Sequence, residues 1–300
     1  GSGIYLGPII LALFIGAVFT TLGRSSAVVV DFFRVIADAV GRLVGLIMYA
    51  APLGLFALVG SAVARNPEAI GSIAGNLSWL TVTFVAAILI QGVVVLPVLL
   101  KVFGHKPVLS FAGKTVPALI NALGSASSTA TLPVTYANVV EDNKVDSRAG
   151  SLVLPLGTMM NLNGTAIYLT VAAIFVAQMF ALPLSILQIL TIAALALLLS
   201  IGSAGVPGTA PFALAILFAT MGYPVEAYGA IGLLVVVDWL FDRGRAVLNV
   251  WGDAVGAAVV SETFEFKTAK LAPGATESSP RTSRSICPMS LRKVDMPMGS

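Results

Sequence analysis

Long apolar runs separated by short polar loops make up most of the chain between Ile4 and Val260. Asp, Glu, Lys, Arg and His are absent from Ala149–Val225, and also from Ala69–Leu100 and Thr115–Val140. Such runs supply several segments of about 20 apolar residues, the length with which a helix crosses a bilayer. They lack the period of two that a membrane barrel needs. The pattern therefore predicts an all-α integral membrane protein.

The first predicted helix is Ile4–Leu22. A second begins with charges at helical spacing, which indicate a face at the membrane interface, and then becomes fully apolar over Leu43–Ala64. These charges are Asp31, Arg34, Asp38 and Arg42. The next predicted span is Leu80–Leu100. The chain opens on Gly1 without an initiator Met or a signal-peptide n-region, so we expect an N-terminally truncated fragment.

Two later apolar runs are broken in the same way. Small and polar residues interrupt the first at Gly124–Pro133 and the second at Gly202–Pro211. The apolar arms on each side are too short for two full spans, so we expect a re-entrant first hairpin at about 109–137 and a second at about 184–222. A long helix with polar residues follows each hairpin. Paired interrupted segments in two halves are typical of inverted-repeat secondary transporters.

A polar stripe runs along the last predicted helix, at residues 225–262. Its members are Asp238, Asp242, Arg245, Asn249 and Asp253. At about 100° of rotation per residue they fall within roughly 80° of arc. Each charge at bilayer depth costs about 2.5–3.5 kcal/mol even on the most lenient scale. The stripe therefore predicts a functional cavity.

Composition agrees with a membrane location and narrows the chemistry. Hydrophobic residues make up 57% of the chain and charged residues 10%, and the mean hydropathy is +0.96. The net charge of +3 comes mostly from loops and the tail, so it indicates lipid contact and does not suggest nucleic acid. After Thr263 the composition shifts to Lys, Ser, Thr and Pro, which predicts a disordered tail over 263–300. Since Cys287 and His105 lie outside the apolar spans, no disulfide framework or His-based metal site is expected.

The residues at the breaks favour binding of an acidic amino acid. A helix N-terminus at Ser127, Ser128 and Thr129 would offer amides and hydroxyls to a carboxylate. Arg245 can hold a second carboxylate through its planar fork, and Asp242, one turn earlier, can accept an ammonium group. An intramembrane serine hydrolase is disfavoured, because no general base is placed near Ser127 or Ser128. A channel stays open as an alternative, since re-entrant hairpins also build pores.

Oxygen-bearing residues near these breaks favour a coupled cation. Asp253, Asn161 and Asn249, with the backbone carbonyls of Gly157–Asn161 and Ser200–Ser203, could supply hard oxygen ligands to dehydrated Na⁺. A proton carried on a carboxylate is the other candidate coupling ion.

Four ordered motifs resemble the dicarboxylate/amino acid:cation symporters, the family of excitatory glutamate and aspartate transporters. They are Ser127-Ser-Thr-Ala-Thr-Leu-Pro133, Asn161-Leu-Asn-Gly-Thr165 with Ala172-Ala-Ile-Phe-Val-Ala-Gln178, Ala204-Gly-Val-Pro207, and Asp238-Trp-Leu-Phe-Asp-Arg-Gly-Arg245 through Asn249-Val-Trp-Gly-Asp253. The resemblance runs from about Ile4 to Val260. It implies a homotrimer in the plasma membrane, with scaffold helices at 1–66 and a transport domain at 77–262 that slides like an elevator.

The resemblance also implies roles for individual residues. Ser128 and Asn249 would bind the substrate main-chain carboxylate, Asp242 its amino group and Arg245 its side-chain carboxylate. The full substrate set is Ser127, Ser128, Thr165, Val206, Gly208, Asp242, Arg245 and Asn249, with Val206 and Gly208 at the tip of the second hairpin, the extracellular gate. One sodium site would use Gly157, Asn161, Asn249 and Asp253, and a second Met159, Ser200, Ile201 and Ser203.

The function that the resemblance implies is Na⁺-coupled symport of glutamate and aspartate, with H⁺ and K⁺ as further candidate ions. The alternatives are symport of a neutral amino acid or a C4-dicarboxylate, or an ion channel. Some positions depart from the family pattern: Asn163 replaces an Asp, Leu162 a Met, Ala246 a Thr, and Ala210-Pro211 a more glycine-rich gate. Asn163 removes a charge from a further cation site, which leaves the sodium stoichiometry open.

Overall fold

The computed structural model is helical throughout the part of the chain that it describes, with no strand there. The described residues are 6–33, 35, 36, 39, 42, 53, 69–203 and 208–263. Nearly all of the predicted span Leu43–Ala64, Arg34 and Asp38 of the charged face, and the predicted disordered tail after Thr263 lie outside these residues. The predicted all-α architecture is confirmed for the described part.

Helix α1 (Leu6–Thr21) forms from the first apolar run. A single 3₁₀ turn, Gly23–Ser26, follows it. The Ser26 hydroxyl oxygen lies 2.9 Å from the carbonyl oxygen of Phe19 and 2.8 Å from that of Gly23, so its single proton can be donated to either and links this turn to the end of α1.

Residues 69–102 form one long apolar helical segment with a local distortion. Helix α3 (Ala69–Leu89) runs into a π-helical turn, Ile90–Val95, and then into α4 (Leu96–Val102). By length and composition, Gly75–Val102 and Ser147–Met179 are the two described helical segments that could cross a membrane. The π-helical turn matters for packing, because the carbonyl of Gly92 accepts a hydrogen bond from Trp251 Nε1 at 3.0 Å.

Two helices joined by a tight turn occupy the first break. Helix α5 (Val108–Ser125) ends at Ala126, whose φ of 51° is left-handed, and α6 (Ser128–Tyr136) begins after Ser127. The Ser127 hydroxyl caps α6 by accepting from the amide of Ala130. The two helices are also joined side by side, since the Thr131 hydroxyl donates to Asn121 Oδ1 at 3.1 Å.

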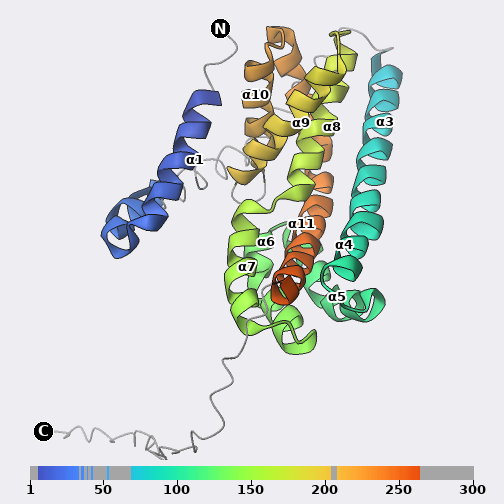
Figure 1. Cartoon of the computed structure of the whole chain (residues 1–300). Coiled ribbons are helices and arrows are strands. Elements are labelled where there is room, and N and C mark those ends of the chain that lie inside the picture. Colours follow the sequence, from blue (N-terminus) through green and yellow to red (C-terminus); the bar gives the residue numbers. More distant parts are fainter. Residues whose placement is uncertain are drawn as a thin grey trace, which may run out of the picture. The chain divides into compact units, whose positions relative to one another are not determined.

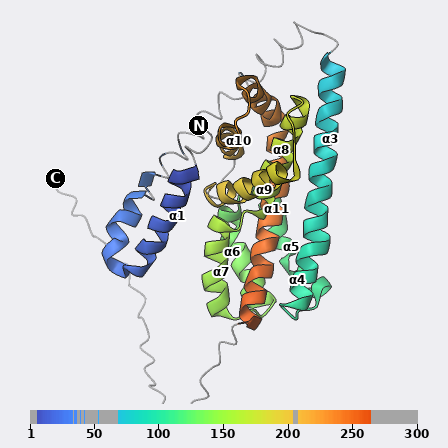
Figure 2. The ribbon, with the colours of Figure 1, turned by 45° about the horizontal axis from the view of Figure 1, so that its top comes forward.

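The remaining helices complete the body around the last one. They are α7 (Ser147–Met160), α8 (Asn163–Met179), α9 (Ile186–Ile201), α10 (Ala210–Met221) and α11 (Gly229–Thr263). Figures 1 and 2 show α5, α6 and α7 around one half of α11, and α8, α9 and α10 near its other half. The main apolar core lies between α3, α8, α9, α10 and α11.

The polar stripe of α11 is enclosed by these helices. The exposed fractions of Asp238, Arg245, Asn249 and Asp253 are 3%, 2%, 3% and 1%. Four of the five stripe residues are therefore buried in the protein interior, and the fifth, Asp242, is partly buried. Two breaks lie next to it: Ala126, between α5 and α6, and Leu162, between α7 and α8, line one cavity with Asp242, Arg245 and Asn249.

Candidate functional site

Arg245 is the centre of a buried charge cluster. Its Nη2 lies 2.9 Å from Asp238 Oδ1 and 2.7 Å from Asp242 Oδ1. The guanidinium carbon of Arg245 lies 4.4 Å above the centre of the Tyr168 ring, so the ring covers one face of the guanidinium group in a cation–π contact. Two carboxylates thus share one nitrogen of one arginine, and the formal charge of the cluster is −1.

The cluster leaves strong donors unused. Arg245 Nε and Nη1 are buried and have no hydrogen-bond partner among the described residues. The hydroxyl of Ser128, on the first turn of α6, is likewise buried without a partner. A buried donor without a partner costs free energy, about 1–3 kcal/mol and more for a charged group. A ligand that brings acceptors to these atoms would recover that cost.

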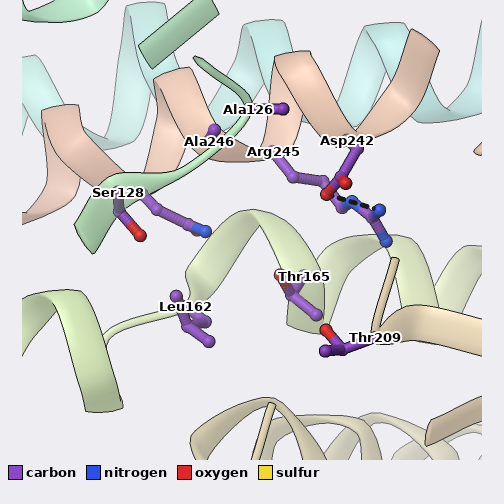
Figure 3. A pocket seen from close by; sticks show the side chains of 9 residues that line it. Ala126, Ser128, Leu162, Thr165, Thr209, Asp242, Arg245 and Ala246 are labelled. Carbon is purple, nitrogen blue, oxygen red and sulfur yellow. Dashed lines mark hydrogen bonds and ion pairs between the residues drawn. The ribbon is translucent and has the colours of Figure 1, made fainter. Parts of the chain in front are cut away.

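These groups line one small cavity (Figure 3). Its lining comes from three helices, α6, α8 and α11, and from the breaks that precede α6, α8 and α10. The residues are Ala126, Ser128, Leu162, Thr165, Thr209, Asp242, Arg245, Ala246 and Asn249. The cavity volume is about 10 Å³, roughly the space of one water molecule. An amino acid can therefore enter only if part of the lining moves.

The second break closes the cavity on one side. The amide of Gly208 donates to Asp242 Oδ2 at 3.2 Å, and Thr209 is part of the lining. Gly208 has a φ of 81°, a conformation that glycine adopts without strain. Val206, the other residue predicted for this tip, lies outside the described residues.

The orientation of the Asn249 amide follows from its neighbour Gly164. Asn249 Oδ1 accepts from the amide of Gly164 at 2.7 Å, so its Nδ2 is the group left for the cavity. A side chain at position 164 would not fit, because its Cβ would lie 2.7 Å from the carbonyl oxygen of Arg245. Asn249 thus offers a donor to a ligand carboxylate, and its side-chain oxygen is already used.

A second polar site surrounds Asp253, further along α11. Asn161 Nδ2 donates to Asp253 Oδ1 at 2.9 Å, whereas Asp253 Oδ2 is buried and has no partner among the described residues. Gly157 makes the close approach possible, because a Cβ there would overlap Asp253 Oδ1. This arrangement leaves Asp253 Oδ2 and the side-chain oxygen of Asn161 as hard oxygen ligands for a cation.

The donor set around Asp253 fits a monovalent cation better than a divalent one. Within the described ranges no three His, Cys, Asp or Glu residues gather as a metal-binding group. One carboxylate with neutral oxygens balances a single positive charge. Asn163 adds no charge here: its Oδ1 accepts from the amide of Gly164 at 2.8 Å, and its Nδ2 turns towards Gly252.

The other predicted residues lie elsewhere. Ser127 caps α6 and is absent from the cavity lining, and Met159 is 55% exposed on α7. At the end of α9, the hydroxyls of Ser200 and Ser203 donate to the carbonyls of Leu197 and Leu199. These residues, with Ile201, stay outside the linings of both the cavity and the Asp253 site. The second sodium set therefore remains a prediction.

Sequence reasoning missed several residues of these sites. Thr209 lines the cavity, Gly164 orients two amides, and Gly252 makes room for Asn161 and Asn163. The Asn163-Gly164 pair could have been noticed as an amide next to a residue without a side chain. Thr209 gives no comparable signal.

A buried arginine whose Nε and Nη1 have no partner in the described part of the chain, set among apolar helices, is typical of helical membrane proteins with a functional polar site at membrane depth. Comparisons with known proteins agree. The model of the Sodium:dicarboxylate symporter family matches residues 2–263. The chain belongs to this family.

Three relatives illustrate the similarity. The chain is 39% identical over 255 residues to excitatory amino acid transporter 1 of Ambystoma tigrinum, covering 85% of this chain and 46% of that protein. Excitatory amino acid transporter 1 of Homo sapiens is 38% identical over 255 residues, with the same coverage. Excitatory amino acid transporter 3 of Oryctolagus cuniculus is 38% identical over 257 residues, covering 86% of this chain and 48% of that protein. The chain spans about half the length of the curated relatives it matches.

Proposed function

We propose that this protein is a secondary active symporter of glutamate or aspartate, driven by Na⁺. One observation carries the proposal: the buried Arg245 keeps Nε and Nη1 unpaired beside a cavity that also contains the unpaired hydroxyl of Ser128. A substrate with two carboxylates would satisfy both sets of donors. A neutral amino acid would leave the arginine donors unpaired, and such sites reject analogues strongly.

The proposed substrate pose follows from the charges. The side-chain carboxylate binds Arg245, and the main-chain carboxylate binds Ser128 and Asn249, whose free amide nitrogen is a donor. The ammonium group binds Asp242 Oδ2. In the structure without substrate, this oxygen accepts a hydrogen bond from the amide of Gly208, which the ammonium group would replace. Thr165 lines the cavity beside this pose.

The proposed ion site is Asp253 with Asn161 and the backbone near Gly157. One Na⁺ there would neutralise the buried carboxylate, whose Oδ2 otherwise lacks a partner. Asp253 and Asn249 lie one turn apart on α11, and Asn161 lies in the break between α7 and α8, four residues before Thr165. Such shared elements support linkage between cation and substrate binding. The proposal extends to a homotrimer in the plasma membrane with elevator motion, as the family resemblance implies.

Counterflow in proteoliposomes tests this function. Labelled aspartate, glutamate and serine are offered with Na⁺, or with choline in its place. We expect aspartate and glutamate to accumulate when Na⁺ is present and not when choline replaces it. Accumulation of serine as strong as that of aspartate would refute the role of Arg245. Downhill flux without counterflow would favour the alternative, a channel.

A further inference from the structure

Asp238 is a buried carboxylate to which the proposed substrate pose gives no role. It lies on α11, 3% exposed, about two helical turns before Arg245 and on the same face of the helix. Asp242 and Arg245 belong to the lining of the cavity, whereas Asp238 does not (Figure 3). Asp238 is therefore not placed to touch a substrate, although its Oδ1 lies 2.9 Å from Arg245 Nη2.

The two carboxylates contact Arg245 in different ways. Asp242 Oδ1 accepts a hydrogen bond from Nη2 at 2.7 Å. Asp238 Oδ1 makes its ion pair with Nη2 without a hydrogen bond, and it accepts none from any other group in the described part of the chain. Asp238 thus contributes a negative charge next to the arginine and one acceptor oxygen that is still unused.

Asp242 faces the cavity and has more than one prospective partner. Its Oδ2 accepts from the amide of Gly208 in the structure and from the substrate ammonium group in the proposed pose. With substrate bound, Asp242 alone would have to serve two cations, the ammonium group and Arg245. A buried ion that loses its counter-charge is strongly destabilising. A second carboxylate at Arg245 therefore matters most when substrate is bound.

Tyr168 completes the support of the guanidinium group from outside the cavity lining. Its ring is held by edge-on contacts with Phe84 on α3 and Phe241 on α11, with ring centres 5.8 and 5.9 Å apart. The arginine therefore has an aromatic wall on one face and Asp238 at Nη2. Neither support depends on the ligand, and Nε and Nη1 remain without a partner in the described part of the chain.

We propose that Asp238 is a positioning residue for Arg245. It holds the guanidinium group in the orientation that binds the side-chain carboxylate of the substrate, and it balances the arginine charge. The charge of Asp242 is then available to the ammonium group, so two carboxylates face two cations. This inference rests on the function proposed above, because it concerns the same site.

A double-mutant cycle tests whether Asp238 acts through Arg245. Binding of labelled aspartate and serine is measured in lipid nanodiscs at saturating Na⁺, for the wild type, Asp238→Asn, Arg245→Cys and the double variant. Asp238→Asn keeps the shape and removes the charge, so it should weaken aspartate by about tenfold or more. In the Arg245→Cys background it should leave serine binding unchanged, because no guanidinium group remains to be positioned.

Two results of this cycle would overturn the proposal. The first is wild-type aspartate affinity in Asp238→Asn. The second is a loss of serine binding in the double variant as large as the loss of aspartate binding in Asp238→Asn, since Asp238 would then act on the fold or directly on the cavity. Glu226→Gln is the control for loss of a carboxylate, because Glu226 is exposed on the 3₁₀ turn before α11, and its aspartate affinity should equal that of the wild type.

Thermal unfolding and a conservative variant separate positioning from general support of the fold. Asp238→Asn should lower the unfolding midpoint when Arg245 is present and raise it in Arg245→Cys, where Asp238 is itself a buried charge without its partner. Asp238→Glu keeps the charge and should bind aspartate more tightly than Asp238→Asn. Equal losses of aspartate affinity in these two variants would contradict a role for the charge.

The same proteins distinguish this inference from the proposed function. Absence of aspartate binding to the wild type, or an Arg245→Cys variant that still prefers aspartate to serine, would overturn the proposed function. Wild-type aspartate affinity in Asp238→Asn, together with the expected change to serine in Arg245→Cys, would overturn only the role of Asp238.

Discussion

Replacing Gly157 by Ala tests whether the close contact between α7 and Asp253 serves cation binding. The added Cβ would overlap Asp253 Oδ1 and lie 2.7 Å from its Cγ. The carboxylate must therefore move away from its hydrogen bond with Asn161. In a packed interior such overpacking costs about 1–3 kcal/mol. If the added methyl group destabilises the Na⁺-bound state by this amount relative to the Na⁺-free state, the Na⁺ dissociation constant rises about 5- to 150-fold.

Tryptophan fluorescence can report the Na⁺ titration. Trp251 is 6% exposed and lies two residues before Asp253, whereas Trp79 and Trp239 are 73% and 66% exposed. Replacing these two by Phe leaves a single reporter near the ion site. The assay measures the Na⁺ midpoint of the purified protein in nanodiscs, with choline keeping the ionic strength constant.

Gly150→Ala provides the matched control on the same helix. Its Cβ would overlap Val140 Cγ2 instead of a polar group. Both variants should lose thermal stability, and only Gly157→Ala should lose Na⁺ affinity. An unchanged Na⁺ midpoint in Gly157→Ala, or an equal loss in both variants, would refute the reasoning.

Three further predictions concern the substrate, the ion and the gate. Arg245→Cys should cost acidic substrates about 3–5 kcal/mol of binding and admit neutral amino acids, and unchanged aspartate affinity would argue against the assignment. Asp253→Asn should weaken Na⁺ binding, and aspartate affinity should recover at saturating Na⁺; a permanent loss would place Asp253 in the substrate site or the fold. A spin-label pair at Thr209 and Thr129 should change its distance distribution with Na⁺ and aspartate, whereas a distance that ignores both ligands would contradict motion of the second break.

The sequence was sufficient where the pattern is local. The polar stripe on α11 follows from helical period alone, so its burial could be predicted without knowing its neighbours. The turn at Ala126 and Ser127 follows from small and hydroxyl residues that favour helix ends, and its position in the structure agrees with that reasoning.

Contacts between distant segments could not be predicted in the same way. The amide of Gly164 bonds to Asn249, 85 residues later, and Asn161 bonds to Asp253, 92 residues later. These contacts depend on how α7 and α8 pack against α11. They decide which atom of each amide stays free for a ligand. Likewise, Asp238 can be placed on the stripe from the sequence, but its sharing of Arg245 Nη2 with Asp242 requires the structure.

The most direct test of the account is reciprocal linkage between Na⁺ and aspartate, measured by calorimetry on the purified protein. Aspartate is titrated at several fixed Na⁺ concentrations, and Na⁺ is titrated with and without saturating aspartate. We predict that each ligand strengthens the other by the same factor, within the range of about 5- to 150-fold typical of coupled sites. Serine should show no such coupling. Aspartate binding that is independent of Na⁺, or absent at all Na⁺ concentrations, would contradict the central claim that Arg245 and Asp253 form the substrate and ion sites of one symporter.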